Sequence, residues 1–203
     1  TSYEYALKYG KSATEFVKSS YDIQSAIAGL NDADLSRFTL SSNVLAAATK
    51  ADAATVTSYM GTMYGIFEKT ASKMGKSNWV NQIAGQTATA VQLYKTTGAE
   101  MQAAFSNLGA TATNIGLSSA QQFALVGELQ LVAKSGSVAG TQAASLLQGI
   151  GKAQESLGIQ LTDDNGDMLA IDVVLGRINN RLSSLGSVAR GDVLTQIFGK
   201  QGA

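Results

Sequence analysis

The sequence contains no cysteine, no histidine and no proline in 203 residues. Without histidine, the chain cannot form a histidine-paired nucleophile, an imidazole general base or a histidine-containing zinc site. Without cysteine, it has no thiolate chemistry, no iron–sulfur ligands and no disulfide. We therefore expect a protein that is not an enzyme, with no catalytic residues, no cofactor and no metal site.

Net charge and long apolar runs are also missing. The 15 basic and 15 acidic side chains cancel, whereas nucleic-acid binding depends on clustered Lys and Arg that neutralise phosphates. The longest strongly apolar stretch, residues 60–67, is far shorter than the roughly 20 residues that a membrane-spanning helix needs. We expect no specific nucleic-acid partner and no membrane contact for this chain.

The lack of proline and the spacing of apolar residues predict an all-α, multi-helix fold. Asp52 is placed as the N-cap of one helix, and Ser77 as the cap of a longer one that continues to Leu108. The apolar stripe of the first of these helices, with steps of three and four residues, consists of Val56, Met60, Met63, Phe67, Ala71 and Met74.

The second half of the chain is divided by clearer signals. Ser118 and Gln121 have the spacing of a capping box, and Gly158 follows an apolar stripe as a C-terminal glycine does. After it, the dipeptide Asn165-Gly166 lies between two short apolar arms, which is the pattern of a hairpin with a type I′ turn. We therefore expect one short β-hairpin near residues 159–169, followed by two more helices.

Residues 77–151 carry only four charged side chains, Lys95, Glu100, Glu128 and Lys134. Helices that face water ordinarily use Lys and Glu freely. One interpretation is an exterior that is simply rich in Ser, Thr and Gln. The other is a surface covered by further subunits, where uncharged side chains avoid the desolvation cost of buried ions. We predict the second, with this segment mediating either self-association or contact with the wall of an assembly that confines the chain.

Three weak motifs have simpler interpretations. Asp163, Asn165 and Gly166 suggest part of a calcium loop, but an EF-hand register would begin on an apolar residue and lack the final Glu. Glu155 precedes a serine, as in lytic transglycosylases, without the rest of that motif. The Gly-Ile-Gly of residues 149–151 has no phosphate-loop context. We interpret these as a turn, a helix end and a site of helix packing.

The order of several short motifs in residues 136–203 resembles the core region of phage tail tape measure proteins. In that family an Ala-Gly-Thr helix, a Leu-Gly-Val/Ile strand, an Asp-x-x-Gly turn, an amphipathic helix and a terminal Phe-Gly follow one another. Only Ser137-Val138 departs, where a more polar pair is expected. The residues that carry the resemblance are Ala139, Gly140, Thr141, Leu157, Gly158, Asn165, Gly166, Phe198 and Gly199.

The resemblance implies a structural role. Tape measure proteins occupy the lumen of the growing tail tube, set its length, and are made in the host cytoplasm before assembly into the virion tail. It also implies a cyclic homo-oligomer, trimer or hexamer, and contacts with the tail tube protein, a tail assembly chaperone and the baseplate hub.

The resemblance also suggests how the chain is organised. Residues 1–116 would form an N-terminal long-helix region and residues 117–203 a tape-measure core subdomain with the hairpin, together one structural unit. Because residue 1 is Thr, we expect a piece of a longer protein.

A second class of protein shares much of the composition. Secreted helical assembly subunits, such as flagellin-like or translocator proteins, are also rich in Ala, Ser, Thr, Gln and Asn and poor in Cys and His. They would carry uninterrupted heptads near the ends of the complete chain, and they do not account for the glycine-divided order after residue 135. This alternative stays open at the level of the sequence.

Overall fold

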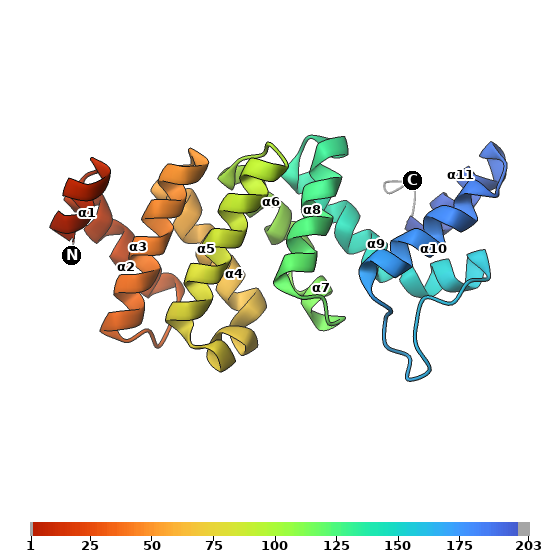
Figure 1. Cartoon of the computed structure of the whole chain (residues 1–203), viewed down its shortest axis with the longest axis horizontal. Helices are drawn as coiled ribbons and strands as arrows, with labels where there is room; N and C mark the ends of the chain where they lie inside the picture. Colours follow the sequence, from red (N-terminus) through yellow and green to blue (C-terminus); the bar gives the residue numbers. More distant parts are fainter. Residues whose placement is uncertain (1, 199–203) are drawn as a thin grey trace.

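The computed structural model describes residues 2–198 and is built from helices joined by short connections (Figure 1). The helices are α1 (Ser2–Tyr9), α2 (Ala13–Ala26), α3 (Asp32–Thr49), α4 (Ala53–Met74), α5 (Lys76–Leu93), α6 (Gly98–Leu108), α7 (Thr111–Asn114), α8 (Ser119–Ala133), α9 (Gly136–Leu157), α10 (Ile171–Ser183) and α11 (Ser187–Phe198). The all-α prediction is confirmed.

The helices pack in two rows. One row consists of α2, α4, α6 and α9, each in contact with the next, and the other of α3, α5 and α8. Contacts between α2 and α3, α3 and α4, α4 and α5, and α8 and α9 hold the rows together. Figure 1 shows an elongated array with α1 at one end and α10 and α11 at the other. Most buried contacts therefore join helices that are close in sequence.

Several predicted helix ends are confirmed. The Asp52 carboxylate accepts a hydrogen bond from the Thr55 amide at 2.8 Å, so it caps α4. The Ser118–Gln121 capping box is formed at the start of α8, and Gly158 ends α9 with a φ of 62°. These ends are set by local hydrogen bonds and by backbone conformation, which short motifs specify.

The predicted long helix from residue 77 to residue 108 is wrong in one respect. It is two helices, because α5 ends at Leu93 and Thr97 caps α6 through the Glu100 amide. Ser77 is not a cap; its hydroxyl donates to Asp34 of α3 at 2.6 Å. The break allows the chain to reverse, so that α6 packs beside α4 in the other row.

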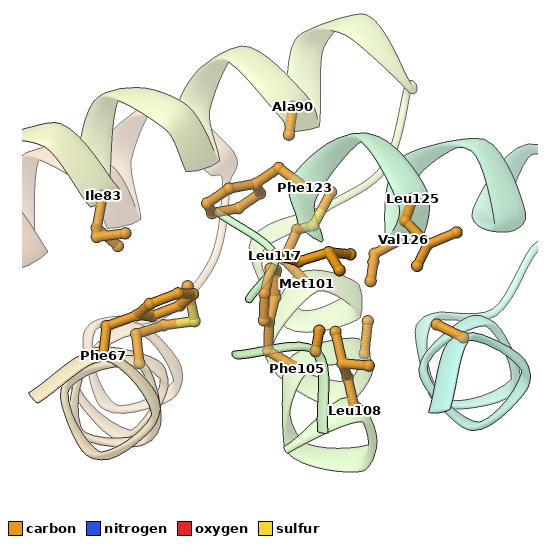
Figure 2. Close-up of a cluster of buried hydrophobic side chains, with 14 of the residues drawn as sticks. Phe67, Ile83, Ala90, Met101, Phe105, Leu108, Leu117, Phe123, Leu125 and Val126 are labelled. Carbon is orange, nitrogen blue, oxygen red and sulfur yellow. The ribbon is translucent and has the colours of Figure 1, made fainter. Parts of the chain in front are cut away.

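The core runs along the whole array between the rows. Figure 2 shows part of it, where Phe67, Ile83, Met101, Phe105 and Phe123 converge from α4, α5, α6 and α8. The Phe105 and Phe123 rings are 4.8 Å apart and tilted by 60°. Burying a side chain of this size contributes about 1.5–3 kcal/mol. The predicted α4 stripe is buried except for Met74, which is 37% exposed.

The predicted β-hairpin near residues 159–169 is wrong: within residues 2–198 no β-strand forms. A single antiparallel bridge joins Thr162 and Met168. The turn is not type I′, because Gly166 has a φ of 85° whereas Asn165 is not in the left-handed region. The Asp163 carboxylate instead accepts hydrogen bonds from the amides of Asn165 and Asp167, both at 2.9 Å.

The pairing stops after one bridge because helix side chains take the neighbouring backbone groups. The Gln154 side-chain oxygen in α9 accepts from the amides of Leu161, at 2.7 Å, and Thr162, at 3.2 Å. Arg177 of α10 donates to the carbonyl of Gln160 at 2.6 Å. The segment is therefore a loop fixed to α9 and α10 rather than a two-stranded ladder.

Candidate functional site

The titratable side chains do not gather into a recognisable catalytic or metal site among the described residues. Among the residues that the structure describes, no three His, Cys, Asp or Glu side chains gather as a possible metal site. Glu155, the carboxylate considered for cell-wall hydrolysis, is exposed near the end of α9. Over the same residues, no helix is long and apolar enough to cross a membrane.

Burial is the main cause of shifted pKa values. It raises the pKa of Tyr59 well above its usual range, although a hydrogen bond of 2.8 Å with Thr87 partly opposes this. Burial and the nearby Glu128 carboxylate raise the pKa of Tyr94. Hydrogen bonds from Thr55 lower the pKa of Asp52. These shifts belong to a buried tyrosine, a partly buried tyrosine and a helix cap, positions explained by folding.

The first group of motif residues lies where α9 crosses α6. Ala139 is fully buried, and Thr141 is exposed with its hydroxyl donating to the Ser137 carbonyl. Gly140 lies against the α6 backbone so closely that a Cβ there would overlap the Ala104 carbonyl oxygen. The Ala-Gly-Thr step therefore lets two helices approach closely.

The second group lies around the loop after α9. Leu157 is 2% exposed, and its carbonyl accepts a hydrogen bond from the Arg181 side chain at 3.0 Å. Gly158 and Gly166 both have positive φ, which glycine adopts without strain, while Asn165 is exposed in the turn. The two groups do not meet in one cleft.

Of the last two motif residues, Phe198 and Gly199, the structure describes only the backbone of Phe198. Phe198 is the final residue of α11, and its side chain lies outside what the structure describes; Gly199 lies outside the described residues altogether. Their suggested role stays a prediction.

The polar side chains of the charge-poor segment, residues 77–151, are divided between interior and surface. Some of these polar side chains are buried between the helices. The side-chain amide of Gln122 donates to the Leu117 carbonyl at 2.9 Å, and the Gln130 side chain accepts a hydrogen bond from the Thr96 hydroxyl. Sequence reasoning missed this use of glutamine inside the array, because spacing alone does not separate a buried Gln from an exposed one.

A further part of that uncharged content lies on the exposed side of α5. We call the exposed surface of α3, α5 and α8 the outer face. On α5, the exposed positions that helical spacing places on this side are Asn78, Asn81, Gln82, Gly85, Thr89 and Gln92. No charged side chain occurs among them. By contrast, α4 in the other row exposes Glu68, Lys69 and Lys73.

Two hollows lie on the outer face, one on each side of α5. The hollow towards α3 has a volume of about 320 Å³, and the one towards α8 about 440 Å³. Asn81 and Gly85 line both, so α5 forms a ridge between them. Arg37 is the one charged residue among the residues that line these two hollows. The α3 contribution, including Leu40 and Val44, was not predicted, because α3 lies outside the charge-poor segment.

Fold and surface together define an all-α protein made of a two-row helical array, in which the exposed side of α5 is uncharged. The family model for phage-related minor tail proteins matches residues 4–199, and the chain belongs to that family. No curated protein and no solved structure matches the chain. Membership indicates a structural role in the phage tail and is consistent with a location in the virion tail.

Proposed function

We propose that the chain is a segment of a tape measure protein, which sets tail length and occupies the lumen of the tail tube. The observation that carries this proposal is the ordered set of motifs in residues 136–203, within a chain that belongs to a tail-protein family over residues 4–199. The segment itself is not the ruler, since a single helix of 203 residues would reach only about 300 Å at 1.5 Å per residue.

The proposal extends to partners by family resemblance. It includes a cyclic homo-oligomer, trimer or hexamer, and contacts with the tail tube protein, a tail assembly chaperone and the baseplate hub. It includes no catalytic activity, no cofactor and no specific nucleic acid. The uncharged exposed side of α5 supports a role in protein contacts, since uncharged side chains can be covered without stripping water from ions.

The experiment is an in-frame deletion of the codons for residues 4–199 in the phage or prophage that encodes the chain. We expect no tails, or tails that are shorter or more dispersed in length than those of the wild type, in negative-stain electron micrographs, with normal length restored by the complete gene supplied in trans. A control deletion in a gene for a tail fibre should leave tail length unchanged. Tails of normal number and uniform normal length after the deletion would overturn the tape measure role.

The deletion also distinguishes two alternative functions, and a peptidoglycan assay tests a third. A minor tail protein at the tail tip predicts tails of unchanged length that fail to infect. A secreted helical assembly subunit predicts normal, infectious tails and recovery of the chain from the medium. A cell-wall hydrolase predicts clearing of a peptidoglycan suspension that Glu155→Gln abolishes, and we expect no clearing with either form.

A further inference from the structure

The outer face of α3, α5 and α8 has the form of a docking surface. A helix ridge with a groove on each side is the shape that packs against the ridges of another helical layer. Gly85 stands on the crest of this ridge, and a Cβ added there would meet nothing within 4 Å. The crest is therefore open to close approach from outside the molecule.

The chemistry of the outer face limits what can cover it. Nucleic acids and anionic lipid surfaces require several cations to neutralise phosphates, and the two hollows have only Arg37 in their linings. A protein surface rich in Lys and Glu that covered α5 would lose hydration of its charges without meeting charges of opposite sign on the exposed side of that helix. The matching occupant is another helical surface that is itself uncharged.

The chain carries such a surface itself. The exposed side of α5 offers Asn, Gln and Thr side chains that can both donate and accept hydrogen bonds, so two copies can satisfy each other. The hollow between α5 and α8 also has an exposed apolar rim, where Leu93 is 65% exposed. Each copy thus brings a ridge, two grooves and an apolar side chain to the same contact.

We propose that the outer face docks a second copy of this chain, with α5 and Gly85 at the centre of the contact. This inference rests on the proposed self-association and adds the surface that mediates it. It does not depend on the tape measure role, because it is tested on the purified chain in solution, whereas tail length is tested in the phage.

The chain offers a matched pair of positions for the test. Gly85 in α5 and Gly65 in α4 are both exposed glycines inside helices, and a Cβ at either meets nothing within 4 Å. Gly85 lies on the outer face, and Gly65 lies on the row that exposes Lys and Glu. A substitution at either position changes the surface without a clash inside the fold.

The first measurement is the molar mass of the full chain by light scattering over a range of concentrations. We expect the mass of the wild type to rise above the 21.0 kDa of one chain, Gly85→Glu to stay at one chain, and Gly65→Glu to follow the wild type. Circular dichroism confirms that both variants keep their helix content. A wild type that stays at 21.0 kDa throughout, or equal behaviour of the two variants, would overturn the proposal.

The second measurement uses the absence of native cysteine. Gly85→Cys and Gly65→Cys each give a chain with one thiol, which a short bismaleimide can link to a second copy. We expect Gly85→Cys to be linked roughly tenfold faster, since a docked pair reacts at an effective concentration in the millimolar range. Equal rates, or faster linking through position 65, would place the contact elsewhere.

Discussion

Gly140 of α9 lies directly on the backbone of Ala104 of α6, with no room for a side chain between the two helices. Gly136, one turn earlier, lies in the same way on the Glu100 carbonyl, and its amide donates a hydrogen bond to the Glu100 carboxylate. This close crossing joins α9, on which the loop and α10 pack, to the preceding part of the array.

Gly140→Ala is therefore expected to destabilise the chain by about 1–3 kcal/mol, because the new methyl group overlaps a backbone atom that cannot move alone. Urea unfolding followed by circular dichroism measures the change. Gly151→Ala in the same helix is the control, since a Cβ there meets nothing within 4 Å. We expect that variant to be stabilised by about 0.5–1 kcal/mol from helix propensity. Equal effects at both positions would contradict the close crossing.

Gly166→Ala is expected to cost about 1–2 kcal/mol, because a side chain in the left-handed region is strained. Asn165→Ala should cost much less, because Asn165 is outside that region. A type I′ turn would instead penalise both positions, so thermal melts of the two variants distinguish the turns. Millimolar calcium should leave the wild-type midpoint unchanged, as the Asp163 carboxylate is already hydrogen-bonded to two amides. A midpoint that rises with calcium would contradict this.

Gln154→Ala is expected to destabilise the chain by about 1–3 kcal/mol, because the fully buried Leu161 loses the acceptor of its amide. Gln154→Glu keeps an acceptor oxygen and should retain most of the stability. Gln148→Ala, at an exposed position of the same helix, provides the baseline. Hydrogen exchange should show the Leu161 amide losing protection in Gln154→Ala alone; unchanged protection would show that another group holds the loop.

Tyr59 predicts a loss of stability at alkaline pH. Burial raises the pKa of Tyr59 in the folded state. Below the unfolded pKa of about 10, the folded and unfolded states both keep the phenol proton, so Tyr59 gives stability no pH dependence there. Above that pH the unfolded state loses its proton first, so the free energy of unfolding falls by about 1.4 kcal/mol per pH unit.

Tyr59→Phe should reduce this alkaline slope, at a cost near neutral pH of about 1 kcal/mol for the lost hydrogen bond. Thr87 keeps its own bond to the Ile83 carbonyl at 2.8 Å, so no new unpaired donor is created. Tyr21→Phe, at a side chain that is 72% exposed, is the control. Identical slopes in the wild type and Tyr59→Phe between pH 10 and 12 would contradict the assignment.

The helical class, some of the helices and several of their ends could be predicted from the sequence because caps and apolar stripes are local features. Asp52, the Ser118–Gln121 pair and Gly158 each act through atoms within a few residues of themselves. The hairpin prediction failed because its outcome depended on Gln154 and Arg177, which bind the loop backbone from other helices. The spacing of residues in the sequence does not show that these side chains compete with strand pairing for the loop's backbone groups.

The sequence by itself determined the helical class, the main caps, the positive φ at Gly158 and Gly166, and the shortage of charge between residues 77 and 151, because each depends on residue type and local spacing. The tertiary structure alone decided that Gly140 meets Ala104 and that uncharged residues are divided between core and surface. It also placed α3 beside α5 in the outer face. These features depend on which helices become neighbours in space, and that is set by the packing of whole apolar faces rather than by any one segment.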